Sequence, residues 1–221
     1  MIAGKCKALA AAVLVLLATG CATQPQKPYD YAEFKAARPA SILVLPPVNT
    51  SAEVIAPYGV LAQATEPLAE SGYYVIPVSL AAATFRQNGL SNPDEIHELP
   101  APKLREIFGA DAALYIKIIR YGTSYQVVQS ETLVAAEARL VDLRSGKLLW
   151  EGSARASSLE QQQHNSNGLI GMLVSAVINQ IVNTTSDASY KMAGIASHRL
   201  LRAGNPNGLL HGPRSPQYQK D

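Results

Sequence analysis

The side chains best suited to metal or acid–base chemistry gather in one short segment of the sequence. Asp94, Glu95, His97 and Glu98 follow one another closely. Carboxylates and an imidazole can bind a divalent metal, and the same groups can transfer protons. The segment has prolines on both sides and no other cysteine or histidine nearby, so we interpret it as a solvated helix start. His164 lies in a glutamine- and asparagine-rich run, which favours a loop over a ligand site.

The sequence contains none of the patterns that identify common catalytic centres. A Gly-x-Ser-x-Gly elbow, a phosphate-binding loop, a Gly-x-Gly-x-x-Gly turn and a His-Glu-x-x-His pair are all absent. We therefore expect a protein that is not an enzyme, with no catalytic residues, no cofactor and no metal.

One thiol stands at a position where covalent modification is expected. Lys5 and Lys7 precede an uncharged apolar run from Ala8 to Ala18, and two small residues then lead to Cys21. A basic start, a short apolar run and small residues at its end are typical of a secretory signal peptide. The run is shorter than the roughly 20 residues that a membrane-spanning helix needs. Residues 1–20 are therefore predicted to be a signal peptide that is removed.

The sequence Leu17-Ala18-Thr19-Gly20-Cys21 resembles the bacterial lipobox, although Ala18 stands where leucine is usual. The resemblance implies that Cys21 receives diacylglycerol and palmitate and anchors the chain to a membrane. The alternative is a buried core cysteine behind an ordinary signal peptide. Ala22, rather than an aspartate, after the cysteine implies sorting to the outer membrane, with the domain on the periplasmic side.

Cysteine content and charge argue against a disulfide-stabilised protein and against a nucleic-acid-binding protein. Cys6 lies in the predicted signal, so the mature chain has no cysteine left for a disulfide once Cys21 is acylated. The chain has 19 basic and 17 acidic residues, and removal of Lys5 and Lys7 leaves the mature chain neutral. A nucleic-acid-binding surface needs clustered basic residues, so we expect no nucleic-acid partner.

The mature chain is predicted to hold one α/β domain between two irregular ends. Residues 21–40 comprise the lipidated cysteine and a tether, because they are rich in Pro, Gln, Ala and Lys and lack an apolar period. Residues 41–203 form the periplasmic domain, and residues 204–221 form a Pro/Gly-rich tail. Within the domain we expect a mixed sheet of about five strands with helices packed on it, in the order β-α-β-α-β-β-β-α-α.

The expected elements follow from the hydrophobic patterns. Strands are predicted at Ser41–Val48, Tyr73–Val78, Ala112–Tyr121, Gln126–Leu143 and Lys147–Ser157. Helices are predicted at Val54–Ser71, as short pieces within residues 79–109, and at Asp187–Ala203. The early strands are expected to be parallel and the later ones antiparallel, with a hairpin at Arg144–Lys147 and Trp150 as a buried anchor. In the strand around Val134–Asp142 every second residue is expected to face a wetter side.

One segment without charged residues has three readings. Gln161–Ser186 contains no Asp, Glu, Lys or Arg, and its apolar residues repeat at helical spacing. It could be a buried structural helix, which we favour, a face for a partner or a second copy, or a membrane-inserted helix. The last is disfavoured because Asn179, Gln180 and Asn183 interrupt the apolar run.

Three stretches in the same order resemble periplasmic domains of the CsgG and TolB amino-terminal type: Ser41–Asn49, Gly109–Ile116 and Leu140–Trp150. The whole mature chain, and above all the tail Leu209–Tyr218, is similar to a family of proteobacterial outer-membrane lipoproteins of unknown function. Their genes lie beside those of a CsgG-like lipoprotein and a third small lipoprotein. The resemblance implies a fold and these two partners but no catalytic residues.

Two functions remain open from the sequence. The first is a non-enzymatic accessory subunit of an outer-membrane lipoprotein complex with a CsgG-like partner. The second is a regulator of a cell-wall synthase, which is disfavoured because the predicted tether is short. The tail offers Leu209, Leu210, Pro213 and Tyr218 as contacts for a partner, and the alternative is that Leu209 and Leu210 cover the domain's own sheet.

Overall fold

Six strands form one open mixed sheet in a computed structural model that describes residues 28–125, 130–160 and 185–220. The strand order is β3-β1-β4-β5-β6, and β2 also pairs with β4. β1, β2, β3 and the start of β4 run parallel, whereas β4, β5 and β6 are antiparallel. The mixed α/β fold predicted from the sequence is confirmed. The strands span Ser41–Val44 (β1), Val48–Asn49 (β2), Tyr74–Val75 (β3), Ala112–Tyr125 (β4), Ser130–Asp142 (β5) and Leu148–Ser157 (β6).

The first predicted strand is split in two. Pro46 and Pro47 lie between β1 and β2, and a proline cannot donate a ladder hydrogen bond. Before the break, the Leu45 N–H still donates to the Leu114 carbonyl at 3.1 Å, so the buried run stays attached to β4.

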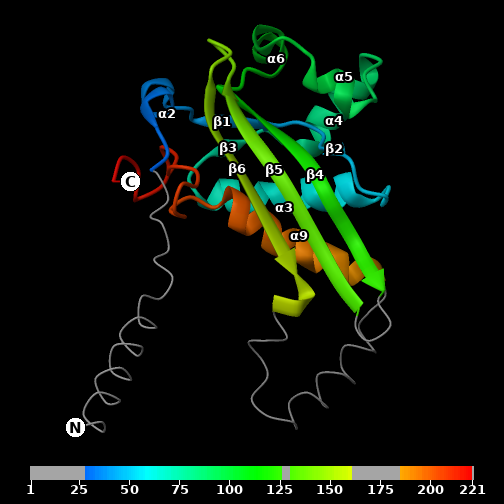
Figure 1. Cartoon of the computed structure of the whole chain (residues 1–221). Coiled ribbons are helices and arrows are strands. Elements are labelled where there is room, and N and C mark those ends of the chain that lie inside the picture. Colours follow the sequence, from blue (N-terminus) through cyan, green and yellow to red (C-terminus); the bar gives the residue numbers. More distant parts are fainter. Residues whose placement is uncertain (1–27, 126–129, 161–184, 221) are drawn as a thin grey trace, which may run out of the picture.

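Two long helices cover one face of the sheet (Figure 1). α3 spans Ala56–Glu70, and its residues Ala56, Val60, Ala64 and Leu68 are buried at a spacing of four, which places them on one side of the helix. α9 spans Thr185–Leu201 and adds Met192, Ala193, Ala196, Leu200 and Leu201 to the same core. This core includes Ile42 and Val44 of β1 and the inward residues of β4, β5 and β6.

Three shorter helices cover only part of the opposite face. α4 (Val78–Gln87), α5 (Pro93–His97) and α6 (Ala101–Phe108) form a second core with the other side of β1 and the beginning of β4. Its buried members include Leu43, Leu45, Phe85, Ile96 and Leu104. Apart from Val141 near the end of β5, which packs against this second core, β5 and β6 are left uncovered on this side (Figure 1).

Asp111 joins the starts of β1 and β4. Its carboxylate accepts hydrogen bonds from the Ala40 N–H at 3.0 Å and from the Ser41 N–H and hydroxyl at 3.2 and 3.1 Å. Burial alone would raise the pKa of Asp111, but these hydrogen bonds outweigh it and lower the pKa. Gly109, in the left-handed conformation with φ of 66°, ends α6 just before this junction.

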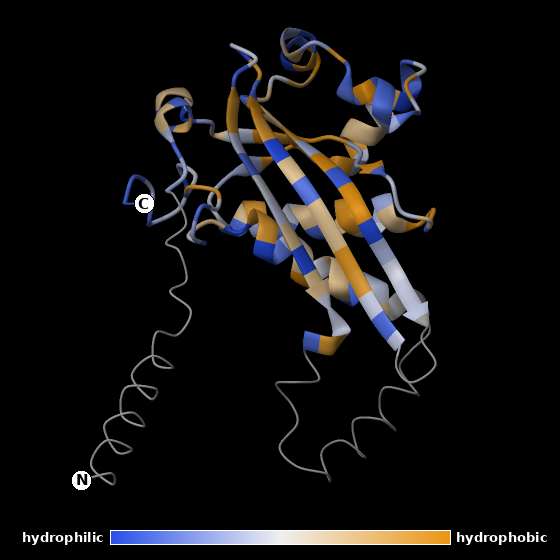
Figure 2. Ribbon diagram, in the orientation of Figure 1, coloured by the Kyte–Doolittle hydropathy of each residue, from blue (hydrophilic) through white to orange (hydrophobic). Residues whose placement is uncertain are grey.

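β5 shows the predicted alternation between a buried and a wetter face (Figure 2). Val134, Ala136, Ala138 and Leu140 are buried against the helices, whereas Glu137 and Arg139 are exposed on the other side. The hairpin at Arg144–Lys147 is also confirmed, and Asp142 closes it by accepting hydrogen bonds from the Ser145 N–H and hydroxyl.

The tether predicted for residues 22–40 is wrong over its described part. α2 spans Ala32–Ala37, with Phe34 buried in the main core. The Tyr29 N–H donates to the Asn207 Oδ1 at 3.0 Å, and the Tyr31 hydroxyl donates to the Gly208 carbonyl. A single buried aromatic in a six-residue helix produces no hydrophobic period, which is why the sequence pattern missed it.

Several sequence predictions lie outside the described residues. These are the signal peptide, Cys21, His164 and most of the uncharged stretch Gln161–Ser186. Among the residues that the structure does describe, no helix is both long and apolar enough to cross a bilayer.

Candidate interaction sites

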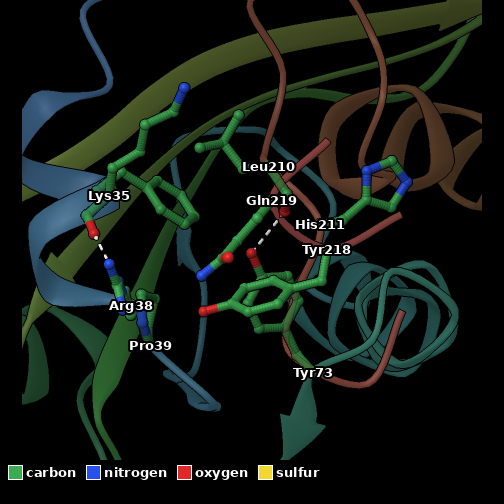
Figure 3. Close-up of a pocket in the computed structure, with 9 residues that line it drawn as sticks. Lys35, Arg38, Pro39, Tyr73, Leu210, His211, Tyr218 and Gln219 are labelled. Carbon is green, nitrogen blue, oxygen red and sulfur yellow. Dashed lines mark hydrogen bonds between the residues drawn. The ribbon is translucent and has the colours of Figure 1, made fainter. Parts of the chain in front are cut away.

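The first candidate site is a pocket between α2 and the C-terminal tail (Figure 3). It has a volume of about 210 Å³ and lies where the two ends of the described chain meet. Its walls are aromatic and apolar, and basic side chains stand at its edge. The lining residues are Phe34, Lys35, Arg38, Pro39, Tyr73, Leu210, His211, Tyr218 and Gln219.

The tail is held in place by close backbone contacts with the segment that follows α3. The Gly212 N–H donates to the Ser71 carbonyl at 2.8 Å, and the Arg214 N–H donates to the Gly72 carbonyl at 3.1 Å. A Cβ on Gly212 would lie 2.6 Å from the Gly72 carbonyl oxygen, so only glycine allows this approach. The tail therefore packs as an ordered part of the domain.

Trp150 fastens the tail from the sheet side. Its side chain is 1% exposed, and its indole Nε1–H donates to the Asn207 carbonyl at 2.9 Å. The prediction that Trp150 is a buried anchor is confirmed, and its hydrogen bond to the tail is an addition that the sequence did not indicate. The indole has its one polar group satisfied, as buried tryptophans usually do.

The four predicted tail contacts lie in different environments. Leu209 is 1% exposed within the main core, so its assignment as a partner contact is wrong and the alternative, covering the domain's own core, holds for it. Leu210 and Tyr218 are half-buried and line the pocket, where the Leu210 carbonyl accepts a hydrogen bond from the Tyr73 hydroxyl. Pro213 is exposed. Leu210 and Tyr218 are thus brought together, whereas Leu209 and Pro213 are not part of the pocket.

The second candidate site is a groove on the uncovered side of the sheet. It is wide and open, with a volume of about 750 Å³, and is mostly polar. α5 forms one wall, and β4, β5 and β6 form the floor. The residues along it are Val48, Asp94, His97, Glu98, Tyr115, Ile116, Lys117, Glu137, Ala138, Arg139, Glu151, Gly152 and Ser153.

Charges of opposite sign face each other across the floor of this groove. In the strand register, Lys117 is directly opposite Glu137, and Arg139 is directly opposite Glu151. The Arg139 guanidinium lies 5.8 Å from the centre of the Tyr115 ring, within the range of a cation–π contact. The floor therefore offers both charges and an aromatic surface on rigid strands.

His97 joins α5 to this floor. Its Nε2 lies 2.9 Å from the Pro46 carbonyl oxygen, and its ring meets the Tyr115 ring edge-on at 5.1 Å. Burial lowers the pKa of His97, although the Pro46 carbonyl and Asp94 act in the opposite direction. The neutral imidazole is thus favoured near neutral pH, and its role is to position α5.

The reading of this segment as a helix start needs one correction. The segment does begin a helix, since Asn92 caps α5 by accepting a hydrogen bond from the Asp94 N–H at 3.1 Å. His97, however, is half-buried at the end of the helix instead of solvated. Within the described residues, no group of three or more His, Cys, Asp or Glu side chains is placed to hold a metal ion.

Comparison with known proteins shows a close relationship to lipoproteins from Neisseria meningitidis. A family model described as "Putative lipoprotein GNA1162-like" matches residues 29–214. "Putative lipoprotein NMB1124/NMB1162" from N. meningitidis serogroup B is 50% identical over 210 residues, which cover 95% of each chain.

Two solved structures illustrate the range of the structural matches. The crystal structure of lipoprotein GNA1162 from N. meningitidis is 54% identical, covers 66% of this chain and 100% of its own, and has a TM-score of 0.52. The LpoB C-terminal domain from Salmonella enterica is 20% identical, covers 52% of this chain and 81% of its own, and has a TM-score of 0.37. The second likeness is too low to support a functional argument.

Proposed function

This chain belongs to the GNA1162-like family of lipoproteins, and from that premise we propose that it is a periplasmic interaction subunit anchored to the outer membrane through lipid on Cys21. Membership in a lipoprotein family implies a membrane anchor. In this proposal residues 1–20 are a cleaved signal peptide, and the ordered domain that follows binds other proteins without performing catalysis. In the same proposal the Cys21 thiol is the group that receives the lipid.

The observation that carries the interaction role is the groove on the uncovered side of the sheet. A small-molecule pocket is usually enclosed and mostly apolar, whereas this groove is open and lined by charged residues. Lys117, Glu137 and Arg139 sit on rigid strands with their charges in a fixed pattern. A fixed pattern of both signs selects a protein surface with the complementary pattern.

The partner that we propose is the CsgG-like lipoprotein implied by the family resemblance, with the third small lipoprotein as a further subunit. Such a partner would be anchored in the same membrane, so that both domains would be held near one surface. Anchoring raises the effective concentration of two proteins and allows a modest interface to be occupied. An open groove can supply such a modest interface.

The alternative function, regulation of a cell-wall synthase, is disfavoured by chain length. The described residues begin at Pro28, and Tyr29 is already hydrogen-bonded to the tail segment. Seven residue steps separate Cys21 from Pro28, which is about 25 Å even when fully extended. A lipoprotein that reaches from the outer membrane through the wall to a synthase would need a longer arm.

Incorporation of labelled palmitate tests the anchor. We expect the Cys21→Ser chain to incorporate no label and to remain as an uncleaved or soluble precursor. Cys6→Ser is the matched control because Cys6 lies in the predicted signal peptide, and this variant should be labelled like the wild type. Labelling of the Cys21→Ser chain, with continued sedimentation in the membrane fraction, would show that the anchor is assigned to the wrong residue.

Co-purification from native membranes tests the interaction role. The lipidated chain, solubilised in mild detergent, is expected to bring down the CsgG-like lipoprotein in a fixed ratio. Recovery of a cell-wall synthase in its place would support the alternative function. Recovery of the chain without any partner would contradict both.

A further inference from the structure

Four basic side chains lie at the joined ends of the chain and form no ion pair with a described residue; two of them, Lys35 and Arg38, line the pocket. Lys35 and Arg38 come from α2 and its end, and Arg214 and Lys220 come from the tail; all four are exposed. We call these four residues and the pocket beside them the terminal face. No salt bridge within 4 Å involves any of the four in the part of the chain that the structure describes.

The contacts of these side chains hold them without cancelling their charge. The Arg38 Nε–H donates to the Lys35 carbonyl at 3.3 Å, and the Lys220 Nζ donates to the Pro216 carbonyl at 2.7 Å. The Arg214 guanidinium lies 5.3 Å from the centre of the Tyr74 ring. The nearby carboxylate of Glu33 is already paired with Lys147 at 2.8 Å. Among the described residues of α2, the segment before it and the tail, these four basic side chains outnumber Asp30, the one exposed carboxylate that has no ion pair.

The chain enters the fold at this same face. Tyr29 is hydrogen-bonded to Asn207, and Phe34 and Leu210 line one pocket, so the first described residues and the tail lie side by side (Figure 1). If Cys21 carries the lipid, Pro28 cannot be more than about 25 Å from the lipidated residue. The part of the domain held nearest the membrane is then the part that carries the unneutralised basic side chains.

We propose that the terminal face binds the anionic headgroups of the membrane to which the chain is anchored. This inference rests on the proposed lipidation of Cys21. A short tether brings the face to the bilayer surface, where each basic side chain is attracted to negatively charged lipids. An acidic protein surface would offer similar charges, but the short connection to the lipidated residue favours the bilayer.

Binding in this manner would also orient the second site. The terminal face is formed by α2 and the tail, whereas the groove lies on the uncovered side of β4, β5 and β6. Figure 1 shows these regions on different sides of the domain. With the terminal face on the membrane, the groove would remain accessible to a second membrane-anchored protein.

Vesicle sedimentation of the lipid-free chain from residue 22 tests this inference. The chain is expected to bind vesicles of phosphatidylglycerol and phosphatidylethanolamine and not vesicles of phosphatidylcholine alone. Replacing Lys35 and Arg38 with glutamine should weaken binding about fivefold for each charge removed, or about 25-fold together. Binding should also be lost at about 1 M salt, where screening limits charge interactions to about 3 Å.

The matched control is the double variant Arg86→Gln with Arg120→Gln. It removes the same charge from exposed positions in α4 and β4, outside the terminal face, and should bind nearly as well as the wild type. Thermal melts of both double variants should match the wild type, because all four side chains are exposed. If the control variant lost as much binding, the net charge of the whole chain would explain the binding, and the proposal would be overturned.

Two other outcomes would overturn the proposal while leaving the assignment of the lipid to Cys21 intact. One is a lipid-free chain that ignores anionic vesicles. The other is a Lys35/Arg38 variant that binds vesicles normally but no longer captures the CsgG-like lipoprotein, which would make the terminal face a protein-binding surface. Palmitate labelling of Cys21 is measured separately, so a failed anchor and a failed terminal face give different results.

Discussion

The antiparallel strands β4, β5 and β6 have one face that is buried under helices and one face that is largely open. On one face of β5, Val134, Ala136 and Leu140 pack against α9 in a continuous apolar core. On the other face, Glu137 and Arg139 stand beside an open groove. Because successive side chains alternate between faces, one strand can supply stability on one side and recognition on the other. Substitutions on the covered face should therefore change folding, and those on the open face should change binding.

The tail belongs to the covered face. Leu209 completes the core, and the Asn207 carbonyl satisfies the Trp150 indole. The joined ends of the chain thus stabilise the side of the sheet that holds α3 and α9, and they leave the groove untouched. Changes on the covered side should therefore lower stability, and the largest loss is expected when the tail is removed.

Deletion of residues 205–221 should have the largest effect on stability. It removes the buried Leu209 side chain, which alone corresponds to about 2 to 5 kcal/mol, and also the acceptors of several hydrogen bonds at about 1 kcal/mol each. We expect a loss of more than about 5 kcal/mol in denaturant unfolding. Deletion of residues 219–221 alone is the control and should have little effect. An unchanged melt after the larger deletion would mean that the tail is free to dock elsewhere.

Trp150→Ala should have the second-largest effect. Truncation of a buried large aromatic costs about 3 to 5 kcal/mol, and this one also leaves the Asn207 carbonyl without its donor. Trp150→Phe keeps an aromatic ring but loses the hydrogen bond and should be less destabilising than the alanine variant. A change below about 0.5 kcal/mol in the alanine variant would be typical of a surface residue and would contradict the assignment of Trp150 to the core.

Titration of His97, in the wall of the groove, should have a smaller effect on the stability of the fold. Because its pKa is lowered in the folded state from the ordinary value of 6.5, the unfolded chain binds the proton more readily. The contribution of His97 to stability is therefore complete above pH 6.5 and decreases as the pH falls below that value. Comparison of unfolding curves for the wild type and His97→Gln across this range measures the effect. Parallel pH profiles would show that burial does not shift this group.

Alternation and apolar runs allowed the sheet and its covered face to be predicted from sequence. The strands around Val44, Leu114 and Val134 each left a clear signal, and so did the hairpin before Trp150. The wetter side of β5 was also predicted, from Glu137 and Arg139. These features depend on local periodicity, which the sequence records directly.

The contacts between distant segments could not be predicted in the same way. Phe34 reaches the core from a short helix, and His97 packs on Tyr115, eighteen residues later in the chain. Neither contact produces a repeat in the sequence. The tail had two readings because its prolines and leucines are compatible with a strap on its own domain or on another protein. The burial of Leu209 and the close approach of Gly212 to Gly72 distinguish them, and both depend on segments that are far apart in the sequence.

The most direct test of the central claim is partner recovery by a chain whose groove lacks the charges of Glu137 and Arg139. Glu137→Gln combined with Arg139→Gln keeps the net charge and shortens only the arginine, and it should change stability by no more than about 1 kcal/mol. Lys103→Gln with Glu106→Gln, on the exposed pair of α6, is the matched control. We predict that the control recovers the CsgG-like lipoprotein from native membranes like the wild type and that the groove variant does not. Equal recovery by both variants would contradict the groove as the docking surface.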